Sequence, residues 1–284
     1  MNKKAFSLVE LSISLVIIAL IISAIMAVNG LSESAKIQGI ISELTVYRDA
    51  ANKFKGIYLQ YPGDLGLAAN YWSSGCSTGG YSCNGNGNGY IENIADTNVS
   101  GSDEEIVKAW KHLSLANLVP MQFALYSGMT YTYQFAPNSQ MPLSKAANVQ
   151  SVYLFNGSPT FIMATLTDIY YTPFTPAQNA IYLSGIFRVS TGDLYSFNSG
   201  VLTSLEAFTL DQKIDDGHYD DSGNAVGAIT GNFRSFTSGQ IFVEANFSDP
   251  EIGNVQCLDG SGNYLVNQSF LNGSRPKCNI GWGL

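Results

Sequence analysis

The sequence predicts an α+β protein in which one long N-terminal α-helix packs on an antiparallel β-sheet head that carries additional helices and two disulfides. Three observations predict this class. An apolar run near the N-terminus continues into a helical pattern, short β-branched or aromatic runs follow between turn signals, and the four cysteines are even in number. The 284 residues, 45% of them hydrophobic, suffice for a large buried core.

The first element is the apolar segment that follows Lys3 and Lys4. Residues 6–28 contain one formal charge, Glu10, and their length is that of a helix that spans a membrane. A carboxylate in hydrocarbon is costly unless a partner neutralises it, so a glutamate at this position indicates a function.

Three interpretations of this segment compete. A conventional secretory signal has a basic start, an apolar stretch of about 7–15 residues and a small-residue cleavage site, here after Ala27, but this apolar run is longer. A plain membrane anchor has the right length and gives Glu10 no role. Either of these would make the chain a membrane-tethered or secreted periplasmic or extracellular protein with a binding or hydrolytic function.

The third interpretation is a family resemblance. The stretch "AFSLVELSISLVIIALI", residues 5–21, resembles the class III signal of type IV pilins and type II secretion pseudopilins: a short basic leader, a small residue, Phe, and Glu four residues later. The resemblance implies that prepilin peptidase cuts between Ala5 and Phe6, that the new amino terminus is methylated, and that the apolar helix is retained. The family usually has Gly where this chain has Ala5, a departure that bears on the rate of cleavage.

The resemblance also implies a function. It indicates a minor pilin or pseudopilin that assembles into a type IV pilus or a type II secretion pseudopilus, with Glu10 pairing with the cationic amino terminus of a neighbouring subunit. The implied partners are other pilin or pseudopilin subunits, contacted through the N-terminal helix, the prepilin peptidase and an inner-membrane assembly platform. The expected location is the bacterial inner membrane, crossed once with a periplasmic head, and then the filament; Lys3 and Lys4 keep the leader cytoplasmic.

The predicted organisation has four parts. They are a leader peptide at residues 1–5, a transmembrane or filament-core helix at 6–28, its amphipathic continuation at 29–55, and a periplasmic globular head at 56–284. The continuation carries an apolar stripe with alternating steps of three and four residues, which is typical of a helix that buries one face. The stripe consists of Ile37, Ile40, Leu44, Tyr47, Ala51 and Phe54.

The head begins at the turn signal "YPGDL", residues 61–65. Two further helices are predicted, over 102–118 and 203–214, with capping boxes formed by Ser102 and Glu105 and by Thr203 and Glu206. Short β-branched or aromatic runs predict antiparallel strands. These runs cover residues 129–135, 151–155, 160–166, 180–189, 193–197 and 240–247.

The four cysteines are Cys76, Cys83, Cys257 and Cys278. Their spacing does not resemble a CxxC zinc site, and their position after the apolar segment suits an oxidising compartment outside the cytoplasm. Three pairings are open, of which the local one, Cys76 with Cys83 and Cys257 with Cys278, needs the fewest assumptions. A C-terminal disulfide loop is typical of the resembling family, which implies the second of these pairs.

Two segments are candidates for weak calcium binding. Asn84, Asn86 and Asn88 have the one-three-five spacing of a calcium loop, but they are neutral amides with Ala95 at the position of the bidentate acid, so a Gly/Asn turn is the favoured interpretation. The second segment is an acidic stretch after the 203–214 helix, for which a solvated turn is favoured. Its acids are Asp215, Asp216, Asp220 and Asp221.

The sequence argues against two functional classes. From residue 56 onward the chain holds 8 Lys and Arg against 18 Asp and Glu, whereas a nucleic-acid-binding surface has a basic footprint, so no nucleic-acid partner is expected. The two histidines, His112 and His218, have no nucleophile motif beside them, and HExxH and phosphate-binding motifs are missing. We therefore expect a structural subunit rather than an enzyme, with no cofactor other than the candidate calcium.

Overall fold

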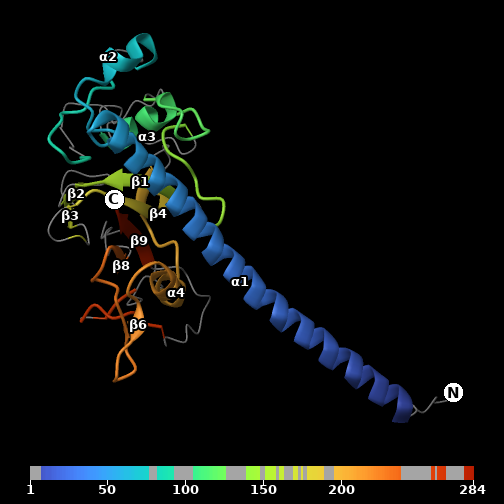
Figure 1. The fold of residues 1–284 in the computed structure, drawn as a ribbon. Helices are drawn as coiled ribbons and strands as arrows, with labels where there is room; N and C mark the ends of the chain where they lie inside the picture. The colour runs from blue at the N-terminus through green and yellow to red at the C-terminus, as the bar shows by residue number, and fades with distance from the viewer. Residues whose placement is uncertain are drawn as a thin grey trace.

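The computed structural model confirms the predicted α+β fold: a long helix and an antiparallel sheet with further helices (Figure 1). The structure describes the ranges 8–76, 82–92, 105–125, 139–147, 151–157, 160–162, 169–171, 174, 178–188, 195–237, 257–259, 261–266 and 278–284. The predicted strands at 129–135 and 240–247 lie outside these ranges.

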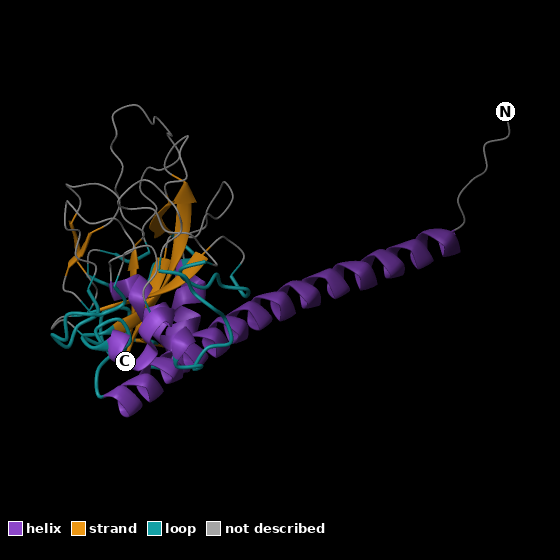
Figure 2. Cartoon of the chain, turned by 90° about the horizontal axis from the view of Figure 1, so that it is seen from above, coloured by secondary structure: helices purple, strands orange, loops and turns teal. Residues whose placement is uncertain are grey.

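Helix α1 (Leu8–Tyr58) is one continuous helix of 51 residues, about 76 Å long at 1.5 Å per residue. Its C-terminal half lies against the head and its N-terminal half projects away from it (Figures 1 and 2). The helix ends at Tyr58. The next residue, Leu59, has a positive φ of 61°, and the predicted turn at Pro62 and Gly63 follows. The start of α1 is therefore the free end of a rod, and the C-terminus of the chain lies in the head.

The predicted apolar stripe of α1 is the face that the head covers. Five of its six members are at most 2% exposed, and Tyr47 is partly buried against the same core. The sequence prediction of a packed amphipathic continuation is thereby confirmed. The five buried members are Ile37, Ile40, Leu44, Ala51 and Phe54.

The other helices flank the C-terminal half of α1. They are α2 (Ala68–Trp72), a 3₁₀ turn η1 (Ser73–Gly75), α3 (Glu105–Leu115) and α4 (Ser204–Ile214). Helices α3 and α4 confirm the two predicted ones. At the start of α4 the predicted capping box is present: Thr203 accepts from the backbone N–H of Glu206, and the Glu206 carboxylate accepts from that of Thr203.

A five-stranded antiparallel sheet forms the centre of the head. Its strand order is β1-β4-β9-β8, and β5 also pairs with β4. Two short hairpins, β2 with β3 and β6 with β7, lie outside it. The strands are β1 (Ser151–Asn156), β2 (Thr160–Ile162), β3 (Ile169–Tyr171), β4 (Ala180–Arg188), β5 (Tyr195–Ser199), β6 (His218–Tyr219), β7 (Ala225–Val226), β8 (Phe233–Thr237) and β9 (Cys278–Gly283).

Trp110 lies where α1, α3 and the sheet meet. Its side chain is fully buried, and the centroid of its ring lies 5.0 Å from the ring centroid of Tyr47 on α1 and 4.7 Å from that of Phe155 on β1. Aromatic pairs at such distances add to the stabilisation from buried area. The core thus joins the long helix directly to the sheet.

Both disulfides follow the local pairing. Cys76 bonds to Cys83 and Cys257 bonds to Cys278. The first encloses the connection between η1 and the Asn-rich loop, and the second ties the segment 257–259 to the first residue of β9. Of the three pairings that the sequence left open, the structure selects the one with the fewest assumptions.

Candidate functional site

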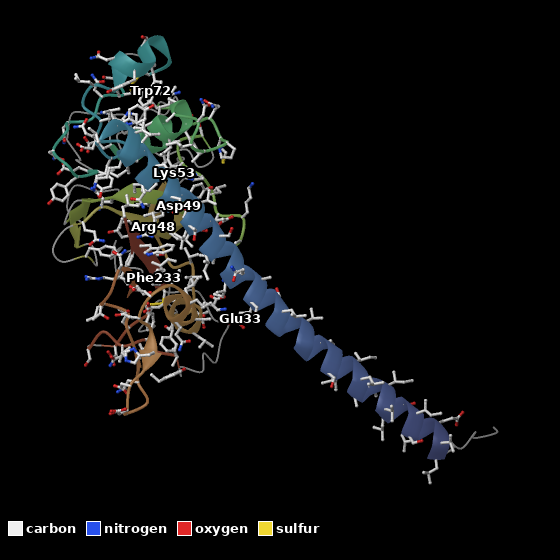
Figure 3. The ribbon with its side chains drawn as sticks, in the orientation of Figure 1. Glu33, Arg48, Asp49, Lys53, Trp72 and Phe233 are labelled. Atoms are coloured by element: carbon white, nitrogen blue, oxygen red, sulfur yellow. A yellow bond between two sulfur atoms is a disulfide. The ribbon has the colours of Figure 1, made fainter. Side chains whose placement is uncertain are left out.

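The N-terminal half of α1 is apolar on all sides and does not pack on the head (Figure 3). Its large apolar side chains are 51–85% exposed, and they include the consecutive residues Leu15, Val16, Ile17 and Ile18. A helix that is apolar all round is suited to an apolar environment or to packing against other helices. Within the described ranges, no helix is both long enough and apolar enough to cross a membrane.

Glu10 lies among these apolar side chains, in the first turn of α1, and it is exposed. The hydroxyl of Ser14 donates to the backbone oxygen of Glu10 at 2.8 Å, a contact within the helix. The predicted cleavage residues, Ala5 and Phe6, lie outside the described residues. The structure thus places the carboxylate close to the helix start, within the projecting half.

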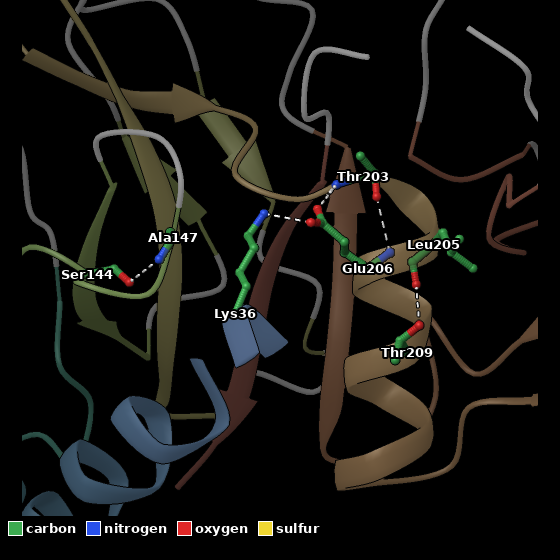
Figure 4. Close-up of polar contacts among 7 residues, drawn as sticks. All are labelled: Lys36, Ser144, Ala147, Thr203, Leu205, Glu206 and Thr209. Atoms are coloured by element: carbon green, nitrogen blue, oxygen red, sulfur yellow. Dashed lines mark hydrogen bonds and ion pairs between the residues drawn. The ribbon is translucent and has the colours of Figure 1, made fainter. Parts of the chain in front are cut away.

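A buried ion pair marks the point where α1 meets α4. Lys36 Nζ lies 2.7 Å from Glu206 Oε1, and Figure 4 shows the lysine pointing from α1 toward the start of α4. Farther along α1, Arg48 donates to the backbone oxygen of Gly283 at 2.7 Å and lies over the ring of Trp282. Two cations of α1 therefore fix the helix to the head, Lys36 at α4 and Arg48 at the end of β9.

Glu43 fixes the middle of the same region. Its Oε2 accepts from the hydroxyls of Ser144 and Tyr153, each at 2.7 Å, and its Oε1 accepts from the backbone N–H of Lys145 at 3.0 Å. Burial, together with the charge of Glu43, raises the pKa of Tyr153 well above its ordinary value. The tyrosine consequently stays protonated and remains a donor to the helix.

The Asn-rich loop is held by its own side chains. Asn84 Oδ1 accepts from the backbone N–H of Ala69 at 2.8 Å. Asn86 Oδ1 accepts from the N–H of Asn88, and Asn88 Oδ1 from that of Tyr90, each at 2.9 Å. The last two are Asx turns, in which a short side chain bonds to backbone two residues on. These contacts engage the three amide oxygens that a cation would need.

Glu105 supports this loop from the first residue of α3. Its Oε1 accepts from the backbone N–H of Asn86 at 2.8 Å and its Oε2 from that of Glu92 at 3.0 Å. Burial raises the pKa of Glu105 to about 7, and the charges of Asp64 and Glu92 add to the rise, while the two hydrogen bonds oppose it. Ser102, its predicted capping partner, lies outside the described residues.

Three carboxylates meet where α4 ends. One oxygen atom from each of Asp211, Asp215 and Asp216 lies within 4.8 Å of the other two. Asp211 is fully buried, Asp216 is partly buried and Asp215 is exposed. Burial raises the pKa of Asp211 to about 7, and the charges of Asp216 and Asp215 add to the rise, which the Tyr264 hydroxyl opposes.

Donors from the rest of the head hold one oxygen of each carboxylate in this cluster. The contacts are Tyr264 Oη to Asp211 Oδ2 at 2.9 Å, Thr230 Oγ1 to Asp216 Oδ2 at 2.7 Å, and the backbone N–H groups of Asn232 and Phe233 to Asp215 Oδ2. The positions of the three acids are thus fixed by segments that lie outside α4.

Asp220 and Asp221, predicted together with Asp215 and Asp216, do not join this cluster. They lie in the turn between β6 and β7. Asp220 Oδ1 accepts from the backbone N–H of Asn224 at 2.7 Å, and its Oδ2 accepts from the side chain of the same residue at 3.0 Å. Hydrogen bonds from Asn224 lower the pKa of Asp220. This carboxylate therefore stabilises the β6–β7 turn in which it lies.

Asp211 is the cluster member that the sequence prediction missed. It lies inside the predicted helix 203–214, where it counts as an ordinary helical residue. It also lies four residues before Asp215, and residues four apart share one face of a helix. Extending the acidic stretch back across the helix end would have found it.

Both histidines contact the backbone. His112 Nδ1 accepts from the N–H of Gly63 at 2.8 Å, and its Nε2 lies 2.7 Å from the backbone oxygen of Cys83. Burial lowers the pKa of His112 to about 4, so the ring is neutral and Nε2 donates. His218 Nδ1 lies 2.7 Å from the backbone oxygen of Asp216. His112 therefore joins α3 to the turn after α1 and to the first disulfide.

Comparison with known proteins bears on the N-terminus. Residues 1–26 match the family model described as the prokaryotic N-terminal methylation motif. No curated protein and no solved structure matches the chain. The matched segment contains Ala5, Phe6 and Glu10 and extends into α1. The chain therefore carries at its N-terminus a prepilin signal of the type found in type IV pilins and pseudopilins.

Proposed function

We propose that this chain is a pilin-like structural subunit, a minor pilin or pseudopilin, that prepilin peptidase processes and that assembles into a type IV pilus or a type II secretion pseudopilus. The observation that carries the proposal is the continuity between the methylation motif and α1. The helix that begins within the motif ends in the core of the head. A signal peptide that is cleaved off would not need to continue as a helix into the core of the head.

The two halves of α1 have surroundings that suit such a subunit. The projecting half exposes apolar side chains, and the other half is fixed to the head by its apolar stripe and by Lys36, Glu43 and Arg48. In the proposal, the projecting half first holds the subunit in the inner membrane with its head in the periplasm. It later packs against the same half of neighbouring subunits. Two disulfides suit the oxidising periplasm.

Glu10 selects the assembled state over the single subunit. Cleavage between Ala5 and Phe6 creates a cationic amine near the start of the apolar helix. A carboxylate in apolar surroundings is costly alone and is stabilised by an opposite charge. When helices pack side by side, the amine of one subunit neutralises Glu10 of the next and fixes their relative height. The partners are thus other pilin or pseudopilin subunits, delivered by an inner-membrane assembly platform.

The mature N-terminus tests the processing step. The full chain is produced in a bacterium with active or inactive prepilin peptidase, and its N-terminal peptide is identified by mass spectrometry. We expect N-methylated Phe6 with the active peptidase and an intact leader with the inactive one. A start at Val28, or an intact Met1 in the presence of the active peptidase, would instead support a secreted or anchored protein.

Incorporation into filaments tests the role of Glu10. Glu10→Ala is compared with Glu33→Ala, a matched change at another exposed glutamate of α1 (Figure 3). We expect both variants to be cleaved normally. Glu10→Ala should lower the sedimented filament fraction at least about tenfold, because the neighbour's amine is left unpaired, and Glu33→Ala should not. Equal incorporation of both variants would contradict the proposed pairing.

A further inference from the structure

The three carboxylates at the end of α4 form a group that the filament proposal does not use. Asp211 comes from the last turn of α4, Asp215 caps the helix and Asp216 follows directly. One oxygen of each lies within 4.8 Å of the others. Negative charges this close repel one another unless a proton or a cation lies between them.

Two oxygen atoms of this group are buried without a hydrogen-bond partner: Asp211 Oδ1 and Asp216 Oδ1. The Asp211 side chain is fully buried, and its other oxygen accepts from the Tyr264 hydroxyl. A buried acceptor that lacks a partner is costly, and most such atoms in proteins are satisfied. The unsatisfied oxygens therefore point to a ligand that would accept their lone pairs.

No side-chain cation fills this role within the described part of the chain. The ion pair found there joins Lys36 to Glu206, at the other end of α4. The Thr230 hydroxyl donates to Asp216 Oδ2, and the backbone N–H of Asn232 donates to Asp215 Oδ2. These donors fix the carboxylates in place, and being neutral they supply no positive charge to the group.

Glycine backbone lies against the group. A Cβ on Gly227 would lie 2.8 Å from Asp211 Oδ2. A Cβ on Gly231 would collide with Asp215 Oδ2 and would lie 2.9 Å from Asp216 Oδ1. Both glycines have positive φ, 113° and 64°, so L side chains are disfavoured there on two grounds. The two glycines therefore allow the backbone to lie directly against the three carboxylates.

We propose that Asp211, Asp215 and Asp216 bind a Ca²⁺ ion. Hard divalent cations take carboxylate oxygens as ligands, and ligands on opposite sides of Ca²⁺ are about 4.6–5.2 Å apart, a range that accommodates this group. Mg²⁺ needs a tighter octahedron with ligands at about 2.1 Å. The ion satisfies both orphaned oxygens and ties α4 to the segment that leads into β8. This site does not depend on filament assembly.

Calcium titration of the purified full chain in detergent, stripped of metal, tests the site. We expect one equivalent to bind with a dissociation constant of about 1 mM or tighter, as in extracellular calcium modules. Saturating calcium should raise the melting temperature by about 5 °C or more, since the ligand stabilises the folded state alone. Mg²⁺ should compete at least tenfold more weakly. No binding up to about 10 mM calcium, or equal affinity for Mg²⁺, would overturn the assignment.

Variants locate the ion. Asp216→Asn should weaken calcium binding at least tenfold, and so should Asp211→Asn, which serves as a second variant should one fail to fold by circular dichroism. Asp220→Asn is the matched control, because that carboxylate belongs to the β6–β7 turn and contacts Asn224. Its affinity for calcium should equal that of the unmodified chain. Unchanged binding in a folded Asp216→Asn or Asp211→Asn variant, or an equal loss in Asp220→Asn, would overturn the proposal.

Discussion

Lys36 and Glu206 join the long helix to the start of α4 across a sequence separation of 170 residues. Their side chains are 8% and 12% exposed, and Nζ lies 2.7 Å from Oε1. The other carboxylate oxygen of Glu206 accepts from the backbone N–H of Thr203 at 2.8 Å (Figure 4). One carboxylate thus caps α4 and anchors α1 at the same time.

Breaking this pair should destabilise the head. Lys36→Met keeps the length of the side chain and leaves Glu206 buried with an unpaired charge, so we expect a loss of about 3 kcal/mol in the free energy of unfolding. Lys53→Met, at an exposed position of α1, should change it by less than about 0.5 kcal/mol. Urea unfolding in detergent, followed by tryptophan fluorescence, measures both.

A double-mutant cycle separates the ion pair from the other contacts of each residue. The double variant with Lys36→Met and Glu206→Gln should lose less stability than the sum of the two single variants, by at least about 1 kcal/mol. Strict additivity would show that the two charges do not stabilise each other.

The two disulfides should differ in their effect. Cys257 and Cys278 are 21 residues apart and Cys76 and Cys83 are 7 apart. In the chain-entropy model, replacing Cys257 and Cys278 by serine costs about 3.4 kcal/mol, and replacing Cys76 and Cys83 by serine costs about 2.5 kcal/mol. Unfolding midpoints of the two double-serine variants under non-reducing conditions check this order. The reverse order would mean that loop length does not govern the stabilisation.

Glu105 should make the head less stable as the pH rises. Its pKa in the folded state, about 7, lies above its ordinary value of 4.5, so the folded state binds the proton more tightly than the unfolded state does. Its contribution to stability is complete below about pH 4.5 and is lost as the pH rises through about 7, by up to about 1.4 kcal/mol per pH unit.

Glu105→Gln should flatten this part of the stability profile, because glutamine does not titrate. Urea midpoints measured between pH 4.5 and 7.5 check the slope, and Glu33→Gln, at an exposed site, should leave it unchanged. Parallel profiles for Glu105→Gln and the unmodified chain would show that Glu105 is already ionised in the folded protein.

Two glycines should respond oppositely to alanine. A Cβ on Gly85 would overlap the backbone oxygen of Gly63 and would lie 2.6 Å from the Cα of Asp64; both are backbone atoms, so Gly85→Ala should cost about 2 kcal/mol or more. Gly56 lies in α1 with open space at its Cβ position, and Gly56→Ala should stabilise by up to about 1 kcal/mol. Melting temperatures that fall in both variants would contradict this account.

The parts of the fold that the sequence predicted are those decided by nearby residues. The capping box of Thr203 and Glu206 depends on residues three apart, and the stripe from Ile37 to Phe54 depends on helical spacing alone. The four cysteines paired with their nearest partners in sequence. Short β-branched and aromatic runs located β1, β2, β4 and β5, but they missed β3, β6, β7, β8 and β9 and did not supply the strand order in the sheet.

The parts that the sequence did not predict depend on tertiary position. Nothing near Lys36 indicates that its partner is Glu206. Glu105 fits a helix cap by spacing, but the fold brings the Asn-rich loop to its carboxylate. Asp211 joins Asp215 and Asp216 only because the helix ends where it does. In each case the sequence shows one charged group, and the fold decides what lies opposite.

The place of β9 in the sheet governs when the head can finish folding. This strand is formed by residues 278–283, yet it lies between β4 and β8 and also bonds through Cys278 to the backbone of Leu202. Until residue 283 has been synthesised, the facing edges of β4 and β8 stay open to other chains, and Cys257 has no partner thiol. An interrupted or truncated chain would therefore expose unpaired strand edges and a free thiol at Cys257, and the addition of β9 removes both.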